Sequence, residues 1–473
     1  MMDYYAHRLG IVLSLLVSMF VFIPKIYAQS QDQELQQMKD KVQQLEQQLQ
    51  ELKEQITKVQ QKSTTVQQAP TPSEPSANIA IRANEEAQET PAAPAETGEK
   101  NKVDIYGHVM LDSGYEFGQS HPNWFDVMRP TQLPSVKGEF APDGKAYFSV
   151  RQTRFGVKTS TPTGIGALKT IFEFELFGTG VDAGQTTFRL RHAYGELGHF
   201  GAGQTWSPFM DIDMFPNSLE YWGPNGMVFF RNVQVRWTPI QDERTRLIFA
   251  VERPGASADG GIYAGRVELD NVKPKFDMPD FSWQARFMRD WGYVQFAGIF
   301  RKISWVNTAT TPPFGPGGDA LGWGINVTSN LNFTKNNIGR FEVVYGDGIQ
   351  NYMNDAPVDV ALRDTSNPSK PVEGVALPVL GIVAFLDHNW SSKFSTSTGY
   401  SLVNISNSNA QNPNDYHQGH YALTNLLYHP VPPVTVGGEF QYGRRVNFRD
   451  GFNVNDYRLQ FSFKYDWKKG FTF

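Results

Sequence analysis

The sequence predicts an all-β protein: a transmembrane antiparallel β-barrel of about 16 strands, preceded by an N-terminal coiled-coil helix. Three observations lead to this prediction. Strand-like segments alternate between apolar and polar residues, their connections alternate between short and long, and a seven-residue apolar repeat lies near the N-terminus. Side chains of a strand point alternately to its two faces, so this alternation separates a lipid-facing surface from a water-lined interior.

The C-terminal strand shows the alternation most clearly. On one parity it carries polar or charged residues, among them Arg458, Gln460 and Lys464. On the other parity every residue is apolar or aromatic: Tyr457, Leu459, Phe461, Phe463, Tyr465 and Trp467. One face of this strand suits lipid and the other suits water, as expected of the strand that closes an outer-membrane barrel.

The composition excludes several other classes of protein. The chain has 473 residues, of which 13% are aromatic and 42 are glycine, and it has no cysteine. A mean hydropathy of −0.42 is too polar for a bundle of membrane helices. The lack of cysteine excludes disulfides and thiolate metal sites. A formal net charge of −5 argues against a nucleic-acid partner.

Residues 1–28 are predicted to be a secretory signal peptide. His7 and Arg8 precede an apolar segment, residues 11–23, and the small residue Ala28 precedes the expected cleavage point. The apolar segment is short for a membrane-spanning helix. The alternative is an uncleaved anchor, and in both cases the chain leaves the cytoplasm.

Residues 29–62 are predicted to form a coiled coil in the periplasm. Apolar residues recur at alternating intervals of three and four, at Leu35, Met38, Val42, Leu45, Leu49, Leu52, Ile56 and Val59. A solitary amphipathic helix drifts away from a strict seven-residue repeat, so the pattern favours self-association. The alternative is a solvated single helix. Residues 63–101, rich in Pro, Ala, Thr, Ser and Glu, are predicted to be a disordered linker.

The barrel domain is predicted to span residues 102–473. Sixteen strands are predicted in this domain. The second of them spans residues 147–159 and the fifteenth spans residues 434–441. Counts of about 14 or 18 stay open, because strand boundaries are uncertain by a few residues. An even count puts both termini at the end of the short turns, the periplasmic end in bacterial barrels. Whether the last strand ends at Trp467 or Phe473 is also open.

The charged residues of each strand are assigned to the interior, because a charge facing lipid at mid-membrane costs ~2–4 kcal/mol. In one strand this places Tyr194 outside, with Arg189 and Arg191 inside. The strands beginning at Phe200 and His420 do not sort into two faces. The predicted pore-lining residues are Arg189, Arg191, Arg236, Arg286, Arg301, Arg340, Glu173, Glu175, Arg458 and Lys464.

Motifs in the middle of the chain point to a family. Residues 188–197 read FRLRHAYGEL, residues 203–209 read GQTWSPF, and residues 231–237 read RNVQVRW. Between them lie Phe215-Pro216-Asn217 and the YWGP of residues 221–224. Together with the coiled coil, these motifs resemble the DcaP-like family of trimeric outer-membrane porins, and the resemblance covers essentially the whole mature chain.

The resemblance implies a sixteen-stranded homotrimer in the bacterial outer membrane, surrounded by its lipids and with the coiled coil in the periplasm. It also implies a third loop folded into the pore and passage of small, often anionic solutes such as dicarboxylates. Contact of the coiled coil with peptidoglycan is a further hypothesis.

The charges lead to a hypothesis about selectivity. The loop at residues 207–228 supplies Asp211, Asp213 and Glu220, which would face an arginine-lined wall. This arrangement creates an electric field across a constriction, and planar guanidinium groups match carboxylates. Glu173 and Glu175 lie on the strand next to Arg189 and Arg191, so part of the positive charge is expected to be paired. The alternative is that the charges only keep the interior wet and neutralise one another.

The sequence predicts neither an enzyme nor a cofactor site. The GxSxG, P-loop and HExxH patterns are absent from it. Asp211 and Asp213 lack further ligands in the sequence, and the pair His417 and His420 lacks a third, so no metal site is predicted. The alternative to a porin is a structural outer-membrane protein with a plugged or closed barrel, whose coiled coil tethers the envelope.

Overall fold

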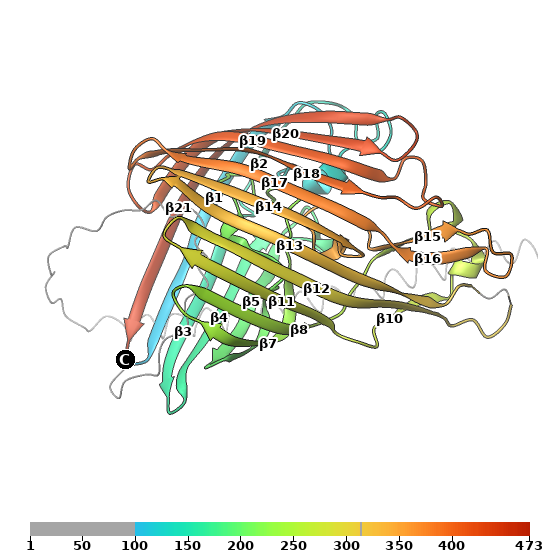
Figure 1. The fold of residues 1–473 in the computed structure, drawn as a ribbon. Coiled ribbons are helices and arrows are strands. Elements are labelled where there is room, and N and C mark those ends of the chain that lie inside the picture. Colours follow the sequence, from blue (N-terminus) through green and yellow to red (C-terminus); the bar gives the residue numbers. More distant parts are fainter. Residues whose placement is uncertain (1–99, 313–314) are drawn as a thin grey trace, which may run out of the picture. The chain divides into compact units, whose positions relative to one another are not determined.

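The computed structural model describes residues 100–312 and 315–473, and in them sixteen strands form a closed antiparallel barrel (Figure 1). The predicted strand count is confirmed. The predicted signal peptide, the coiled coil and nearly all of the linker lie outside the described residues. The barrel strands are β1 (Lys102–Glu116), β3 (Arg154–Thr163), β4 (Gly166–Phe177), β5 (Thr186–Leu197), β6 (Phe200–Trp206), β7 (Arg231–Gln241), β8 (Thr245–Glu252), β11 (Asp280–Arg289), β12 (Gly292–Asn307), β13 (Gly318–Thr334), β14 (Asn337–Asp347), β17 (Pro378–Asn389), β18 (Phe394–Ile405), β19 (Tyr416–Tyr428), β20 (Val434–Asn447) and β21 (Asn453–Thr472).

Pairing between β1 and β21 closes the barrel. The ladder runs from Lys102 opposite Thr472 to Glu116 opposite Arg458. The closing strand is therefore longer than its aromatic alternation, and it continues past Trp467 to Thr472.

The second predicted strand, residues 147–159, is interrupted. A short strand β2 (Lys145–Ser149) pairs with the end of β1, and β3 pairs with its beginning. Between them Arg151 turns inward, where it forms a buried ion pair with Asp126 at 2.6 Å. The prediction of one continuous strand is wrong because this arginine leaves the sheet to meet an acid of the first loop.

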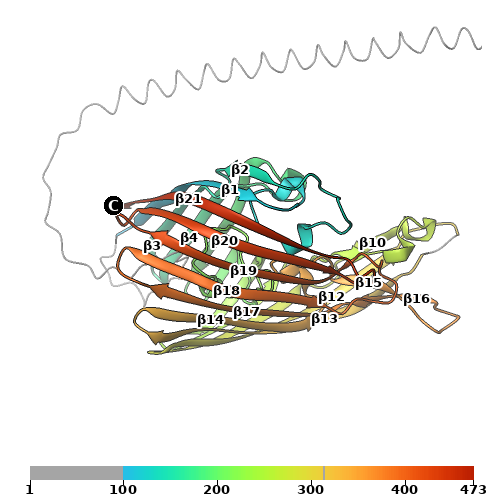
Figure 2. The same cartoon turned by 90° about the horizontal axis from the view of Figure 1, so that it is seen from above.

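The first and last strands begin and end at the same end of the barrel, which also carries the tight turns (Figure 1). The other end carries the longer connections, including β10 (Val272–Lys275) and a three-stranded sheet of β9 (Ala258–Asp259), β15 (Val360–Asp364) and β16 (Val372–Ala376) (Figure 2). The last connection, residues 448–452, is shorter than predicted because β20 continues to Asn447.

Short 3-10 helices punctuate the connections: η1 (Pro122–Trp124), η2 (Pro130–Gln132), η3 (Gly180–Asp182), η4 (Ile212–Met214), η5 (Gly261–Tyr263), η6 (Val267–Leu269) and η7 (Gln350–Tyr352). Among the described residues, no helix is long and apolar enough to cross a membrane.

The outer surface of the barrel is apolar, as the alternation predicts. On β21, Phe461 is 60% exposed, whereas its neighbours Gln460 and Ser462 are buried on the inside. On β7, Val235 is exposed and Arg236 is buried. The period of two therefore separates the two faces of the wall correctly on these strands.

Tyr194 is an exception, and its predicted outward position is wrong. A β-bulge in β5 adds one residue, Arg191, between two successive pairs of the β4 ladder. One extra residue reverses the alternation beyond it. Tyr194 consequently points inward, where its ring centre lies 5.2 Å from the guanidinium carbon of Arg236.

Three long loops fold into the barrel: the first loop (residues 117–144), the constriction loop (residues 207–230) and the sixth loop (residues 348–377). An apolar cluster joins the constriction loop and the sixth loop to the inner faces of β12, β14, β17 and β18. Its buried members include Phe209, Met210 and Val228 from the constriction loop, with Ile349 and Tyr352 from the sixth.

A second apolar cluster explains why the faces of β19 could not be assigned. Tyr421 and Leu423 of β19 point inward, where they pack against Met128 of the first loop and against Met214 and Met227 of the constriction loop. The inner face of this strand is apolar because loops, rather than water, cover it.

Candidate pore constriction

The constriction loop is attached to the barrel through Asp211. Its carboxylate pairs with Arg286 of β11 and accepts hydrogen bonds from Tyr293 of β12 (2.8 Å) and Thr328 of β13 (2.6 Å). It also caps helix η4 by accepting the backbone N–H of Asp213 at 3.1 Å. One buried carboxylate thus joins the loop to three strands, and the guanidinium group offsets its charge.

Asp213 strengthens the same attachment. Its carboxylate also pairs with Arg286, and its carbonyl oxygen accepts bonds from Arg340 of β14 and from Asn330 of β13. Arg340 pairs in turn with Asp387 of β17 at 2.5 Å. The structure therefore brings Asp211 and Asp213 together with two predicted arginines, in ion pairs and hydrogen bonds that hold the loop.

Two glutamates of the wall that were not among the predicted site residues hold the loop backbone. Glu439 of β20 accepts the N–H of Leu219 at 2.7 Å and that of Glu220 at 3.1 Å. Glu342 of β14 accepts the N–H of Val228 at 2.8 Å. The inward parity of Glu342 was visible in the sequence, but the loop backbone that it binds was not.

Glu220 lies away from the arginines. Its carboxylate accepts the backbone N–H groups of Met128 (3.1 Å) and Trp222 (2.9 Å) and the hydroxyl of Tyr421 (3.1 Å). It also accepts the N–H of Gly223, whose φ of +81° suits glycine. Burial raises the pKa of Glu220 to about 8. This side chain fixes the turn of the loop against the first loop and β19.

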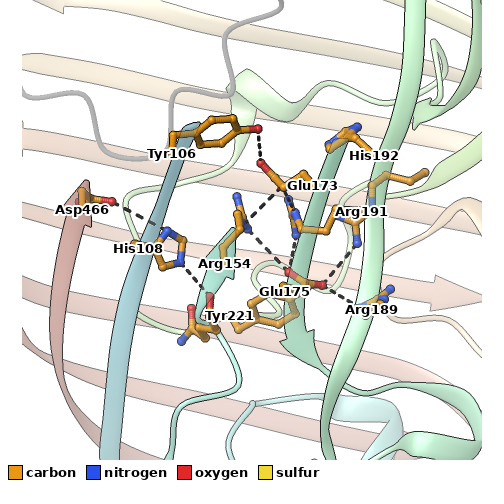
Figure 3. Close-up of polar contacts among 12 residues, drawn as sticks. Tyr106, His108, Arg154, Glu173, Glu175, Arg189, Arg191, His192, Tyr221 and Asp466 are labelled. Carbon is orange, nitrogen blue, oxygen red and sulfur yellow. Dashed lines mark hydrogen bonds and ion pairs between the residues drawn. The ribbon is translucent and has the colours of Figure 1, made fainter. Parts of the chain in front are cut away.

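A second group of charges lies on β3–β7 (Figure 3). Glu173 and Glu175 of β4 are buried, and Arg191 of β5 bridges them at 2.5 and 2.6 Å. Arg154 of β3 lies 3.6 Å from Glu173. Cross-strand positions on one face of a sheet explain the pairing, as the parity of β4 and β5 predicted.

Two more arginines surround Glu175. Arg189 lies 3.4 Å from its carboxylate and Arg231 lies 3.7 Å from it. The hydroxyl of Tyr221, from the constriction loop, donates to the same carboxylate. We name the set Arg154, Arg189, Arg191, Arg231, Glu173 and Glu175 the arginine cluster. It holds four guanidinium groups and two carboxylates, and the loop touches it.

The other predicted residues have different positions. Arg236 of β7 points inward and donates to the side chain of Gln234 and to the carbonyl oxygen of Trp206. Arg301 and Arg458 are buried away from the arginine cluster. Three of the predicted residues form further ion pairs: Arg301–Asp280 (3.0 Å), Arg301–Asp359 (2.9 Å), Arg458–Glu116 (2.8 Å) and Lys464–Asp466 (3.0 Å).

A cavity of about 420 Å³ lies between the constriction loop and the tight-turn end of the barrel. The loop contributes apolar side chains to it, including Phe215, Leu219 and Phe229. The wall and turns contribute its charged and titratable residues: His108, Arg154, Arg191, Lys393, His429, Lys464 and Asp466. Arg154 and the turn residue Lys393 were not among the predicted pore-lining residues, although the parity of residues 155–158 places Arg154 inside.

No group of three or more metal-ligating side chains occurs within residues 100–312 and 315–473. Asp211 and Asp213 are engaged by Arg286. His417 bonds Asn407 (2.9 Å) and His420 bonds Gln418 (3.1 Å).

Comparison with known proteins gives a family. A family model described as "DcaP outer membrane protein" matches residues 28–466. The outer membrane channel DcaP of Acinetobacter baumannii has a similar fold, with a TM-score of 0.65 and 19% identity, over 80% of this chain and 100% of that one. An anion-selective porin from Comamonas acidovorans matches with a TM-score of 0.51 and 9% identity, over 78% and 100%. A search among curated proteins found no match.

Proposed function

Because the chain belongs to the DcaP outer membrane protein family, we propose that it is a porin for small hydrophilic, anionic solutes such as dicarboxylates. The family is one of outer membrane proteins and not of enzymes, and this chain forms a β-barrel of the bacterial outer membrane. The porin from Comamonas acidovorans that shares this fold is described as anion-selective. The charges inside the present barrel argue for the same preference.

The observation that carries the proposal is the charge of the large cavity beside the constriction loop. Its permanently charged cations are Arg154, Arg191, Lys393 and Lys464, whereas its acids are Asp466 and Glu220. Glu220 is largely protonated at neutral pH, because burial raises its pKa to about 8. The cavity therefore carries net positive charge where its water-lined wall meets the loop, and a focused positive potential concentrates anions.

The arginine cluster is the proposed selectivity element. It carries an excess of positive charge beside the loop, and its guanidinium groups present paired donors that match carboxylates. Arg286 pairs with both Asp211 and Asp213 and offsets one of their two charges, which weakens the field of the loop acids. The stronger contribution to the proposed transverse field is therefore the excess of arginine on the opposite wall. The alternative is that these charges only neutralise one another. In that case the excess of arginine would have no effect on ion selectivity.

The experiment is single-channel recording of the purified protein in a planar bilayer under a potassium chloride gradient, repeated with potassium succinate. The proposal predicts conductance and a reversal potential displaced toward the anion equilibrium potential. A cation-selective channel would contradict the proposed substrate class. A silent membrane, with the barrel folded by heat-modifiable gel mobility, would contradict a porin.

We propose further that the protein is a homotrimer whose coiled coil, residues 29–62, stands in the periplasm. The heptad repeat supports self-association, and the family resemblance supports three copies. Contact of the coiled coil with peptidoglycan is part of the same proposal. Conductance steps in groups of three, and a pull-down of peptidoglycan that requires residues 29–62, would test these two points separately.

A plugged structural barrel is the second candidate, and one observation favours it. The first, constriction and sixth loops pack into the barrel through two buried apolar clusters. A barrel filled in this way could serve chiefly to anchor the coiled coil. The same recording separates the candidates, because a plugged barrel conducts no current.

A further inference from the structure

We infer that a small oxyanion binds in a recess on the inner faces of β3–β8, separate from the arginine cluster. The recess has a volume of about 130 Å³. It lies toward the tight-turn end of the barrel. The basic and hydroxyl-bearing residues that line the recess include Lys158, Lys169, Tyr194, Arg236, Thr238 and Arg246.

The first observation is two buried guanidinium groups that lack a direct ion-pair partner among the described residues. Arg236 is 7% exposed and Arg246 is 6% exposed. Among the described residues, neither forms an ion pair with a carboxylate. Arg236 donates to the oxygens of Gln234 and Trp206. With the amide of Gln284 turned so that its oxygen faces Arg246, that oxygen accepts a hydrogen bond from the guanidinium group at 2.9 Å.

Neutral partners satisfy the donors of these arginines. Carboxylates act on them only at longer range, Asp211 and Asp213 on Arg246 and Glu252 on Arg236. These acids have closer partners in Arg286, Ser207 and Ser282. A buried charge without an opposite charge is costly, so such sites normally contain a counter-ion or a paired acid. Arg286, the next arginine along this wall and the cross-strand neighbour of Arg246, illustrates the paired case with Asp211 and Asp213.

The second observation is an unpaired donor in the same recess. The hydroxyl of Tyr194 is buried and has no hydrogen-bond partner. The β-bulge in β5 turns this side chain inward, and Gly201 makes room for it, since a Cβ atom there would lie 1.6 Å from the hydroxyl oxygen. A buried hydroxyl usually finds a partner. An anion beside Arg236 would accept this bond.

Charge and size define the ligand class. Lys158 and Lys169 line the recess as well, and Glu196 is its only acid. The recess therefore has excess positive charge even with Glu196 paired. Its volume exceeds the ~30 Å³ share of one water but leaves no room for a large solute. A carboxylate, sulfate or phosphate group fits this volume. A planar guanidinium group binds such an oxyanion through two parallel N–H···O hydrogen bonds.

This inference deepens the proposed function, because solutes would reach the recess through the lumen, but binding itself requires no conduction. The test is isothermal titration of the full-length, detergent-solubilised protein with sodium sulfate at low ionic strength. We expect saturable binding with one sulfate per chain. Removal of charge-assisted hydrogen bonds by Arg236→Gln with Arg246→Gln should weaken it at least ~10-fold.

The matched control is Arg244→Gln with Arg289→Gln, which removes the same charge from exposed positions at the same end of the barrel. This control should bind sulfate as the wild type does. Arg236→Lys with Arg246→Lys keeps the charge and should retain part of the affinity.

Equal loss of binding in the exposed and buried double variants would overturn the site in favour of bulk charge. Absence of saturable binding to the wild type would overturn it outright, even if the glutamine variant did not fold. A channel that is silent or cation-selective but binds one sulfate would leave the site standing and reject the proposed function.

Discussion

The two sides of the barrel interior are built differently. On the wall of β11–β14 and β17–β20, apolar residues and pairs of acids with arginines attach the inner face to folded loops. On the wall of β3–β8, arginines and lysines outnumber the acids, and several of them line cavities. The first wall fixes the constriction loop, and the second presents charge to the space that the loop leaves. Attachment of the loop and presentation of positive charge therefore lie on different strands, and selectivity by the second wall remains the proposal to test.

The largest effect is expected from Arg286→Ala on the loop-bearing wall. The change leaves Asp211 and Asp213 without their cation, and breaking a buried ion pair costs ~3–5 kcal/mol. The heat-modifiable gel transition should move to lower temperature, and the open-channel current should become noisy. Arg289→Ala, at an exposed position of the same strand, should leave both unchanged. If Arg286→Ala has the current noise and the gel-transition temperature of the wild type, the ion pairs do not hold the loop.

A smaller effect is expected from Glu439→Gln. An amide keeps the size but weakens two charge-assisted bonds from the loop backbone, at a cost of ~1–3 kcal/mol. The measurement is the frequency of current fluctuations in the single channel. Glu373→Gln provides the control, since Glu373 pairs with Arg363 at the exposed end of the sixth loop and such pairs contribute little. Equal fluctuation in both variants would argue against a specific attachment of the loop.

A comparable or slightly smaller effect is expected at Gly201 on the basic wall. Gly201→Ala places a methyl group against the ring of Tyr194, and overpacking typically costs ~1–3 kcal/mol. Gly195→Ala is the matched control, because a Cβ there meets its nearest atoms at 3.7 Å. Melting should fall only for Gly201→Ala, and adding Tyr194→Ala should remove the difference. If it does not, Tyr194 lies outside as the simple alternation predicts.

The most gradual effect, spread over several pH units, is expected from pH acting on Glu220. Burial raises its pKa from 4.5 to about 8, so between these values the folded state holds a proton that the unfolded state has lost. This contribution to the free energy of unfolding is complete below pH ~4.5 and disappears as pH rises through about 8. Wild-type melting should fall between pH 6 and pH 9 by more than that of Glu220→Gln, which cannot ionise. The same fall in both proteins would exclude Glu220 as its source.

The sequence determined the barrel because its signals are local and repeated. The alternation around Phe461 and Arg458 marks two faces of a strand whatever the rest of the chain does. The β-bulge at Arg191 carries no such signal, so Tyr194 was placed on the wrong face. The sequence also could not show that Glu439 binds a loop backbone more than two hundred residues earlier in the chain. Loops packed inside a barrel turn inner faces apolar, as at Tyr421, and remove the alternation itself.

The ion pairs also divide into those that the local sequence pattern predicts and those that depend on folded loops. Two consecutive strands carry Glu173, Glu175, Arg189 and Arg191. Because consecutive strands of the barrel pair with each other, the sequence was sufficient to predict these ion pairs. Arg301 meets Asp359 only because the sixth loop folds back onto β12. Residues paired across neighbouring strands were predictable, and residues paired through folded loops were not.

The most direct test of the division between the two walls is the reversal potential of Arg189→Gln with Arg191→Gln under a potassium chloride gradient. The double change removes half of the guanidinium groups of the arginine cluster and leaves the attachments of the loop through Asp211, Asp213 and Glu439 in place. We expect an unchanged noise level and a shift of selectivity toward cations, whereas Arg244→Gln with Arg289→Gln should leave selectivity as it is. A reversal potential equal to that of the wild type would show that the arginine cluster only neutralises its own glutamates and that the basic wall does not select ions.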